Sequence, residues 1–287
     1  MSGPAVTPRL SLCGPGRAGR AFLRSWLSAG GLLGDVVARQ AAAAERAVRE
    51  LQAGHARGIE ESLDPCDIFV LAVPDDAIAL VAASLAARVS CRFAFHLSGA
   101  LGAEALAPLR IRGAAVGSLH PLRAFTGAAD ETWRGAFVAV EGETKATEAG
   151  LAIARTLGAL GHVLPSQGKA LYHAGAQLAA GGTAAAISLG VRAWEAGGLD
   201  PEVARAALGE LAAGAAAAVA ARPFEDAFTG AVARRDLGTI GAHIEVLASL
   251  PDVRAAYARL AAETLARTPG RGREEEVRKL LARWMLE

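Results

Sequence analysis

Residues 14–19 form a G-x-G-x-x-G turn between an apolar run at 10–13 and a helical pattern. The turn reads Gly14-Pro15-Gly16-Arg17-Ala18-Gly19. In a strand-turn-helix unit the first glycine permits the tight turn and the second lets the backbone approach a pyrophosphate. The third lets the helix pack close to the strand. Because N–H groups at a helix start attract phosphate charge, the motif predicts a dinucleotide site.

Strand and helix patterns alternate along the first part of the chain. We expect strands at 10–13, 35–39, 68–73, 93–97, 114–119, 136–140 and 161–164, and helices at 17–29, 40–53, 76–88 and 144–160. The run 68–73 is wholly apolar, which is typical of a strand buried on both faces of a parallel sheet. The alternation predicts right-handed βαβ units and therefore an α/β, Rossmann-type doubly wound sheet.

The sequence after Pro165 differs in composition and in pattern from the part before it. From 168 to 287 it holds no strand pattern, only Ala- and Leu-rich segments broken at Gly197-Gly198, Arg222-Pro223 and Pro251. Asp200-Pro201-Glu202 predicts a helix N-cap followed by proline at the first helical position. We therefore expect two domains, a dinucleotide-binding domain over 1–165 and an all-α C-terminal domain over 166–287.

Charge and cysteine content exclude several classes of protein. The 30 basic and 29 acidic residues are interspersed and give a net charge of +1, so no basic patch indicates nucleic-acid binding. Cys13, Cys66 and Cys91 are unclustered, which favours reduced thiols in the cytoplasm and predicts neither a disulfide framework nor a metal site. The first twelve residues lack the apolar stretch of a signal peptide.

A long uncharged stretch runs between Lys169 and Arg192 and is long enough to span a bilayer. Ala and Gly dominate it, and Tyr172, His173 and Gln177 lie within it, so its membrane insertion would be poor. We expect instead a helix buried in the helical domain of a soluble, cytoplasmic protein, with no membrane partner.

The end of the second expected strand indicates which nucleotide binds. NAD sites place an acidic residue there for the ribose hydroxyls, whereas this strand ends in Arg39. A guanidinium matches a 2′-phosphate, which favours NADP over NAD. The alternative is that Arg39 is a solvated strand end.

Two further loops follow central strands and would face the same crevice. Val73, Pro74 and Asp75 follow the 68–73 strand, and Ser98-Gly99 follows the 93–97 strand. We assign these residues to cofactor binding. Pro74 could instead simply end its strand, and Asp75 with Asp76 could cap the next helix.

Several motifs occur in an order and at spacings that resemble those of one bacterial family. They are F-V-L-A-V-P-D-D at 69–76, H-L-S-G-A at 96–100, G-S-L-H-P-L at 117–122, L-Y-H-A at 171–174 and F-T-G at 228–230. The sequence resembles proteins that join a Rossmann-like domain to a helical domain of unknown function. These are related to β-hydroxyacid dehydrogenases, pyrroline-carboxylate reductases and ketopantoate reductases. The resemblance covers nearly the whole chain and implies a 6-phosphogluconate-dehydrogenase-like architecture.

The resemblance also implies NADP binding, a homodimer formed through the helical domain, and reduction of a small anionic carbonyl or imine acid. The sequence departs from the family pattern at three positions. Arg123 replaces Gln, Gly181 replaces Asn and Ala231 replaces Pro. Losing the Asn favours either a different substrate or the loss of catalysis.

Candidate catalytic residues fall in two places. Hydride delivery to a carbonyl requires a proton donor, and His120, held by the following proline, is the first candidate. Lys169, His173 and Gln177 share one stripe of a helix at i, i+4 and i+8, where a substrate carboxylate or cofactor phosphate would pair with the buried cation. Tyr172 is an alternative donor.

Each of these residues also has a structural interpretation. His120 and His173 could bond local carbonyls, Lys169 could be a solvated first-turn residue, and Tyr172 could be a core residue. We regard Arg123 and Arg234 as weaker substrate anchors and treat the remaining histidines as structural, namely His55, His96, His162 and His243.

Three functions compete at this point. The leading hypothesis is an NADP-dependent oxidoreductase that transfers hydride to a small 2-oxo or imine acid such as a ketopantoate-like compound. A prephenate-type dehydrogenase is supported only by the G-x-H-P motif. A non-catalytic dinucleotide-binding sensor or interaction protein is supported by Gly181.

Overall fold

The structure is a computed structural model that describes residues 7–284, and the chain divides after Gln177 into two compact units. The first unit contains every strand of the described chain, the last of which ends at Val163. Helix α6 (Lys169–Ala196) begins in the first unit and continues into the second. The domain boundary that we expect near 165 lies just after the last strand, whereas the two compact units divide after Gln177.

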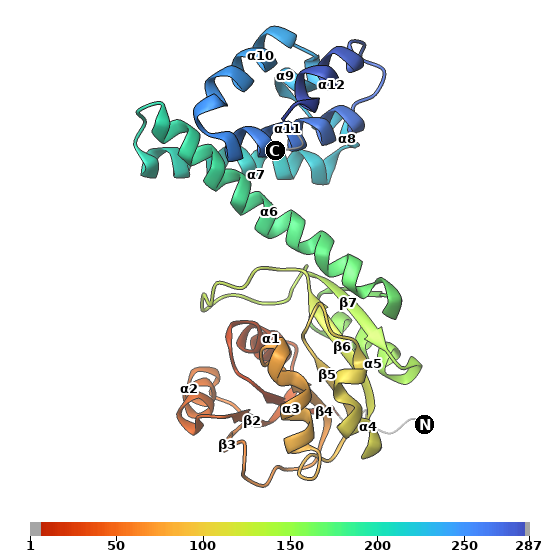
Figure 1. Cartoon of the computed structure of the whole chain (residues 1–287). Coiled ribbons are helices and arrows are strands. Elements are labelled where there is room, and N and C mark those ends of the chain that lie inside the picture. Colours follow the sequence, from red (N-terminus) through yellow and green to blue (C-terminus); the bar gives the residue numbers. More distant parts are fainter. Residues whose placement is uncertain (1–6, 285–287) are drawn as a thin grey trace. The chain divides into compact units, whose positions relative to one another are not determined.

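An eight-stranded sheet forms the first unit, in the order β3-β2-β1-β4-β5-β6-β7-β8 (Figure 1). Its strands are β1 (Arg9–Cys13), β2 (Leu32–Ala38), β3 (His55–Gly58), β4 (Cys66–Leu71), β5 (Cys91–His96), β6 (Ala115–Pro121), β7 (Phe137–Gly142) and β8 (Leu160–Val163). This order confirms the expected doubly wound α/β sheet, with the central strands β1 and β4 buried on both faces.

The sheet differs from expectation at two strands. Strand β7 runs antiparallel to β6, because the connection between Pro121 and Phe137 contains no helix to return the chain for parallel pairing. Strand β3 was not among the strands predicted from the sequence. This edge strand reads His-Ala-Arg-Gly and carries no apolar pattern, and only its pairing with β2 makes it a strand.

Helices cover both faces of the sheet. They are α1 (Arg17–Ser28), α2 (Ala41–Leu51), α3 (Asp75–Leu85), α4 (Ala107–Ile111) and α5 (Thr144–Thr156). Helices α1, α2 and α5 pack on one face and α3 and α4 on the other. Alternate residues of each strand point to opposite faces, so Ile68 joins the first layer and Phe69 the second.

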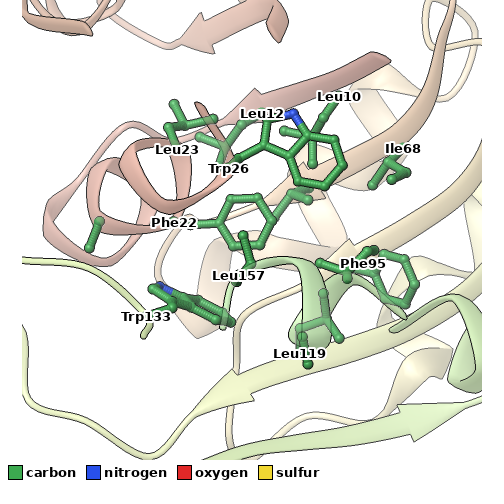
Figure 2. Packing of buried hydrophobic residues seen from close by; sticks show 14 of the residues in the cluster. Leu10, Leu12, Phe22, Leu23, Trp26, Ile68, Phe95, Leu119, Trp133 and Leu157 are labelled. Atoms are coloured by element: carbon green, nitrogen blue, oxygen red, sulfur yellow. The ribbon is translucent and has the colours of Figure 1, made fainter. Parts of the chain in front are cut away.

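The larger core layer lies beneath α1. Phe22 and Trp26 of α1 pack on Leu10 and Leu12 of β1, as Figure 2 shows. Trp133, from the connection between β6 and β7, is fully buried and meets Phe22 edge-on with ring centroids 5.0 Å apart. Burying each such side chain stabilises the fold by about 1.5–3 kcal/mol, which fixes the carboxyl end of β1 relative to α1.

The second unit contains helices alone among the described residues, which confirms the all-α prediction. Beyond α6 it comprises α7 (Pro201–Ala221), α8 (Phe224–Ala227), α9 (Gly230–Arg234), α10 (Leu237–Val246), α11 (Pro251–Arg267) and α12 (Glu274–Ala282). The Asp200 side chain accepts hydrogen bonds from the N–H groups of Glu202 and Val203, so the predicted N-cap is present. A core around Ile240 and Leu265 joins α10, α11 and α12.

The expectation that residues 169–192 form a buried helix is wrong for the single chain. None of the most apolar window of Ser166–Ala196 is buried, and only 6% of that of Pro201–Ala221. By length and composition alone both helices could cross a membrane. Leu178 and Leu211 are exposed because the small core of the second unit is built from α10 to α12 and leaves these faces uncovered within the described chain.

Candidate functional site

The glycine turn has the geometry that its sequence predicts. Gly14 adopts φ +93°, and a Cβ there would lie 2.7 Å from the carbonyl oxygen of Ala72. A Cβ on Gly19 would lie 2.6 Å from the carbonyl oxygen of Gly14, so α1 packs close to the strand ends. Gly16 has open space where its Cβ would be, and no side chain caps α1. The turn therefore leaves backbone free for a phosphate to approach.

A cavity of about 680 Å³ opens beside this turn, at the carboxyl ends of the central strands. It is lined by Cys13, Gly14, Pro15, Gly16, Ala38, Arg39, Gln40, Ala43, Ile59, Ala72, Val73, Pro74, Asp76, Ala77 and Val81. Arg39 is exposed directly after β2, while the remaining walls are mostly apolar. A mostly apolar pocket with one guanidinium at its rim is suited to a nucleoside that carries a phosphate.

Six of the predicted cofactor residues line this cavity and six do not. Those outside its lining are Arg17, Ala18, Gly19, Asp75, Ser98 and Gly99. Arg17 is exposed and its stem lies against Gly127, where a Cβ would be 3.2 Å from Arg17 Cγ. Gly19 is a packing residue of the turn.

Asp75 and Ser98 connect the two loops that follow β4 and β5. The Ser98 hydroxyl donates to Asp75 Oδ2 over 2.8 Å and accepts from the N–H groups of Ala100 and Leu101. Buried His96 supports the same turn, since its Nδ1 accepts from Ser98 N–H and its Nε2 bonds the carbonyl of Gly102. The turn that presents Gly99 is thus held rigidly from both sides.

His120, Tyr172 and His173 converge beside Gly99. The Nδ1 atom of His120, on β6, lies 2.8 Å from the Tyr172 hydroxyl at the start of α6. The His120 and His173 rings meet edge-on with centroids 5.7 Å apart. A Cβ on Gly99 would lie 2.8 Å from His120 Nε2 and 2.5 Å from His173 Nδ1. Only glycine leaves the two imidazoles this room.

Lys169 lies deeper, in a buried polar network that was not predicted from the sequence. Its ammonium donates to the Ser118 hydroxyl and lies 3.5 Å from Glu141 Oε2. Glu141 also accepts from the N–H of Ala103 and the hydroxyl of Ser166. Lys169 is therefore not the solvated first-turn residue of the structural interpretation. The partner that we assigned to a substrate or cofactor is Glu141 of the same chain.

The sequence carried one weak signal for Glu141. A carboxylate at the end of the otherwise apolar strand 136–140 implies a buried partner, but nothing in the sequence identifies Lys169 as that partner. Gln177, the third residue of the predicted stripe, is exposed. The stripe thus changes from a buried cation to an exposed amide along α6.

Burial sets the protonation of the site. It lowers the pKa of His120 to about 4, an effect that electrostatic interaction with His173 and Lys169 reinforces. It raises the pKa of Tyr172 and lowers that of Lys169, where Glu141 opposes the change. His120 is therefore a neutral imidazole and Tyr172 a protonated phenol near neutral pH.

One further cluster within residues 7–284 has ligand atoms close enough to share a metal ion, although no metal site was predicted from the sequence. Ligand atoms of Asp35, His55 and Asp64 lie within 4.8 Å of one another. Arg57 already pairs with both carboxylates, at 3.2 Å from Asp35 and 3.8 Å from Asp64. Asp35 also accepts the N–H of Asp64, so the cluster joins β2, β3 and the following loop.

Comparison with known proteins follows this division of the chain. One family model, a Rossmann-like domain, matches residues 4–121, and a second, a domain of unknown function called DUF2520, matches residues 136–264. The chain joins a Rossmann-like domain to a DUF2520 domain. This pairing confirms the family that the sequence motifs resemble. The DUF2520 match begins before β7, so it includes the last part of the sheet as well as the helices.

Solved structures share the fold over most of the chain. A protein from Thermotoga maritima is 24% identical, with a TM-score of 0.68 over 96% of this chain and 97% of its own. A Bacteroides fragilis protein described provisionally as an NADP oxidoreductase is 18% identical, with a TM-score of 0.69 over 90% and 97%. A 1-pyrroline-5-carboxylate reductase from Streptococcus pyogenes is 12% identical, with a TM-score of 0.62 over 90% and 98%.

Because their sequences are only 12–24% identical to this chain, these likenesses establish the fold alone. Prephenate dehydrogenases also match, over a smaller share of the chain. No curated protein sequence matches significantly. The chemistry of this chain therefore has to be argued from its own site.

Proposed function

We propose that the protein is an NADP-dependent oxidoreductase that transfers hydride to a small 2-oxo or imine acid, with a ketopantoate-like compound as the leading substrate. The convergence of His120, Tyr172 and His173 on Gly99 carries the proposal. These groups belong to the same unit as the glycine turn and its cavity. A dinucleotide site and a cluster of proton-bearing side chains together are what carbonyl reduction requires.

The cofactor half of the proposal rests on the cavity. The Gly14–Gly19 turn would hold the pyrophosphate, and Val73 with Pro74 would line the crevice next to it. Arg39 would bind the 2′-phosphate, which gives the preference for NADP. When bound, NADPH supplies the hydride.

The catalytic half rests on the histidines. His120 and His173 would contact the substrate and orient its reacting oxygen or nitrogen, and Tyr172 bonds His120. Lys169 would be a positioning residue. Its ammonium contacts Ser118 and Glu141 and so anchors the first turn of α6. Negative charge that develops on a substrate oxygen would be stabilised by the N–H groups at this site.

Nucleotide titration followed by fluorescence tests the proposal. NADPH should bind more tightly than NADH, Arg39→Ala should weaken NADPH about tenfold or more, and Gly16→Asp should abolish binding of both. Arg46→Ala, an exposed arginine of α2 outside the cavity lining, is the matched control. Oxidation of NADPH with 2-oxo and imine acids then identifies the substrate, whereas failure to bind either nucleotide would overturn the proposal.

Gly181 favours one alternative, a non-catalytic dinucleotide-binding sensor or interaction protein. A polar side chain that the family carries on this helix is missing here. Such a protein would bind NADPH and oxidise none of it with any acid of the panel. A prephenate-type dehydrogenase has only its short G-x-H-P motif in support, and prephenate belongs in the same panel.

We also propose a homodimer formed through the helical domain. Helices α6 and α7 enclose an apolar groove of about 640 Å³, lined chiefly by Ala179, Ala186, Ile187, Leu208, Leu211, Ala212, Ala215 and Val219. Exposed apolar side chains gathered along one groove favour an interaction site. Its many alanines would allow helices of a second copy to approach closely. Covered in this way, α6 and α7 would belong to a soluble, cytoplasmic dimer.

A further inference from the structure

The hydrogen bond between Tyr172 and His120 has a direction that the surrounding residues determine. In a neutral imidazole one ring nitrogen carries the proton and the other accepts. His120 Nδ1 is the sole hydrogen-bond partner of the Tyr172 hydroxyl among residues 7–284. If Nδ1 donated, the phenol proton would face a half-buried site with no protein acceptor. A phenol is also a stronger donor than a neutral imidazole N–H, and the bare ring nitrogen is a stronger acceptor than a phenol oxygen, so the phenol donates and Nδ1 accepts.

The proton of the neutral His120 ring is consequently on Nε2. That atom lies at the edge of the ring that faces Gly99, 2.8 Å from the position of a Cβ on that residue. His173 Nδ1 lies 2.5 Å from the same position, is buried, and has no hydrogen-bond partner among the described residues. Two ring nitrogens thus lie against Gly99, at distances that leave no room for a side chain on that residue.

We propose that Tyr172 is a positioning residue that holds His120 in the Nε2–H tautomer, so that a neutral imidazole offers a hydrogen-bond donor beside Gly99 to the carbonyl oxygen of a 2-oxo acid. The proposal rests on the proposed function for its substrate. It narrows the substrate class as well. A carbonyl oxygen needs a donor, whereas a protonated imine carries its own N–H and needs an acceptor.

The charges that face His120 from neighbouring elements are consistent with a neutral donor. Lys169 and His173 on α6 oppose a positive charge on the ring, as does His96 on β5, whereas Asp75 at the start of α3 favours it. Burial adds to the opposition. Hydrogen-bond donation from Nε2 therefore needs no imidazolium, and the rate of reduction should show no loss as pH rises from 6 to 8, the range in which an ordinary histidine loses its charge.

Nitrogen NMR of the full chain without cofactor or substrate tests the tautomer directly. In protein labelled with ¹⁵N-histidine, long-range ¹H–¹⁵N correlations distinguish Nδ1–H from Nε2–H, and His120→Gln identifies the His120 signals. We expect the wild type to prefer Nε2–H about tenfold, which is the contribution of one hydrogen bond. Tyr172→Phe should reduce that preference and mix the two forms.

The chain provides a matched control in its second unit. His243 Nδ1 lies 3.1 Å from the Tyr257 hydroxyl, again with the two rings edge-on. Tyr257→Phe removes the same hydroxyl from this pair and should leave the His120 signals unchanged. A wild-type His120 in the Nδ1–H form, or one unaffected by Tyr172→Phe, would overturn the inference.

Kinetics separate positioning from a purely structural role. With a 2-oxo acid as substrate, Tyr172→Phe should lower kcat about tenfold while NADPH affinity and the thermal midpoint stay near wild type. Equal loss of nucleotide binding would indicate a structural role instead. The NMR result does not depend on activity, so its failure is distinguishable from failure of the proposed function, which the nucleotide titration tests.

Discussion

Lys169 and Glu141 form a buried ion pair in which Nζ lies 3.5 Å from Oε2 and each side chain is 4% exposed. The pair links the first turn of α6 to β7, and Ser118 and Ser166 complete its hydrogen bonds. Because Tyr172 and His173 follow Lys169 by three and four residues, one turn of helix carries both from this anchor to His120. The ion pair therefore determines where the candidate catalytic groups lie.

Replacing Glu141 by Gln should destabilise the fold. The substitution leaves the Lys169 ammonium buried without a counter-charge, at a cost of about 3–5 kcal/mol in the free energy of unfolding. Denaturant unfolding measures the loss. Glu148→Gln, on the exposed face of α5, is the control and should change the free energy by less than about 0.5 kcal/mol. Equal effects of the two substitutions would show that the pair contributes nothing.

A methyl group at Gly99 should disrupt the site more than the backbone. The φ angle of Gly99 is not positive, so alanine is allowed there, but its Cβ would meet both imidazoles at 2.5–2.8 Å. Gly99→Ala should cost about 1–3 kcal/mol in stability and displace His120 or His173, with the rate of NADPH oxidation falling more than tenfold. Gly16→Ala, with no atom within 4 Å of the new Cβ, should keep wild-type stability.

Local signals predicted most of the fold. Glycines at fixed spacing determine the turn at Gly14, and the wholly apolar run 68–73 can hardly be other than a buried strand. The features that were not predicted depend on contacts between residues that are distant in sequence. Strand β3 exists because β2 pairs with it, and Glu141 meets Lys169 across 28 positions of chain. Neither contact can be predicted from a short stretch of sequence.

For the candidate site, the sequence predicted the individual residues but not the contacts between them. His120, Tyr172 and His173 were each selected separately by motif, and the sheet brings them together because β6 and the start of α6 lie side by side. The roles of Gly99 and Glu141 follow from atomic distances that no spacing rule supplies. Exposure of α6 was missed because a run of alanine and leucine looks the same in a core and at an interface.

Stability should fall as the solution is acidified, and buried histidines are one cause. Burial lowers the pKa of both His96 and His120 to about 4, whereas the unfolded chain titrates near 6.5. Below 6.5 the unfolded state binds more protons, so stability present above that pH is lost between about 6.5 and 4. Each histidine contributes a slope of about 1.4 kcal/mol per pH unit within that window.

Proton uptake on unfolding at pH 5 measures this effect. The wild type should take up about one proton more than His120→Asn, which lacks one of the two groups. His162→Asn, which removes an exposed histidine, is the matched control. Equal uptake by the wild type and His120→Asn would show that His120 titrates alike in both states.

The proposed dimer predicts how charges on α7 act. Leu211 is 68% exposed on the apolar groove of α6 and α7, and a glutamate there would be desolvated in a dimer but solvated in a monomer. Leu211→Glu should therefore shift the protein from dimer to monomer in sedimentation, with little change in secondary structure. Ile111→Glu, 83% exposed on α4, adds the same charge away from the groove and should leave the dimer intact.

Because α6 also carries Tyr172 and His173, monomeric Leu211→Glu protein shows whether their contact with His120 needs the second copy. If the wild type sediments as a monomer, the groove must be covered by something else, and vesicle flotation would then show whether α6 and α7 enter a bilayer.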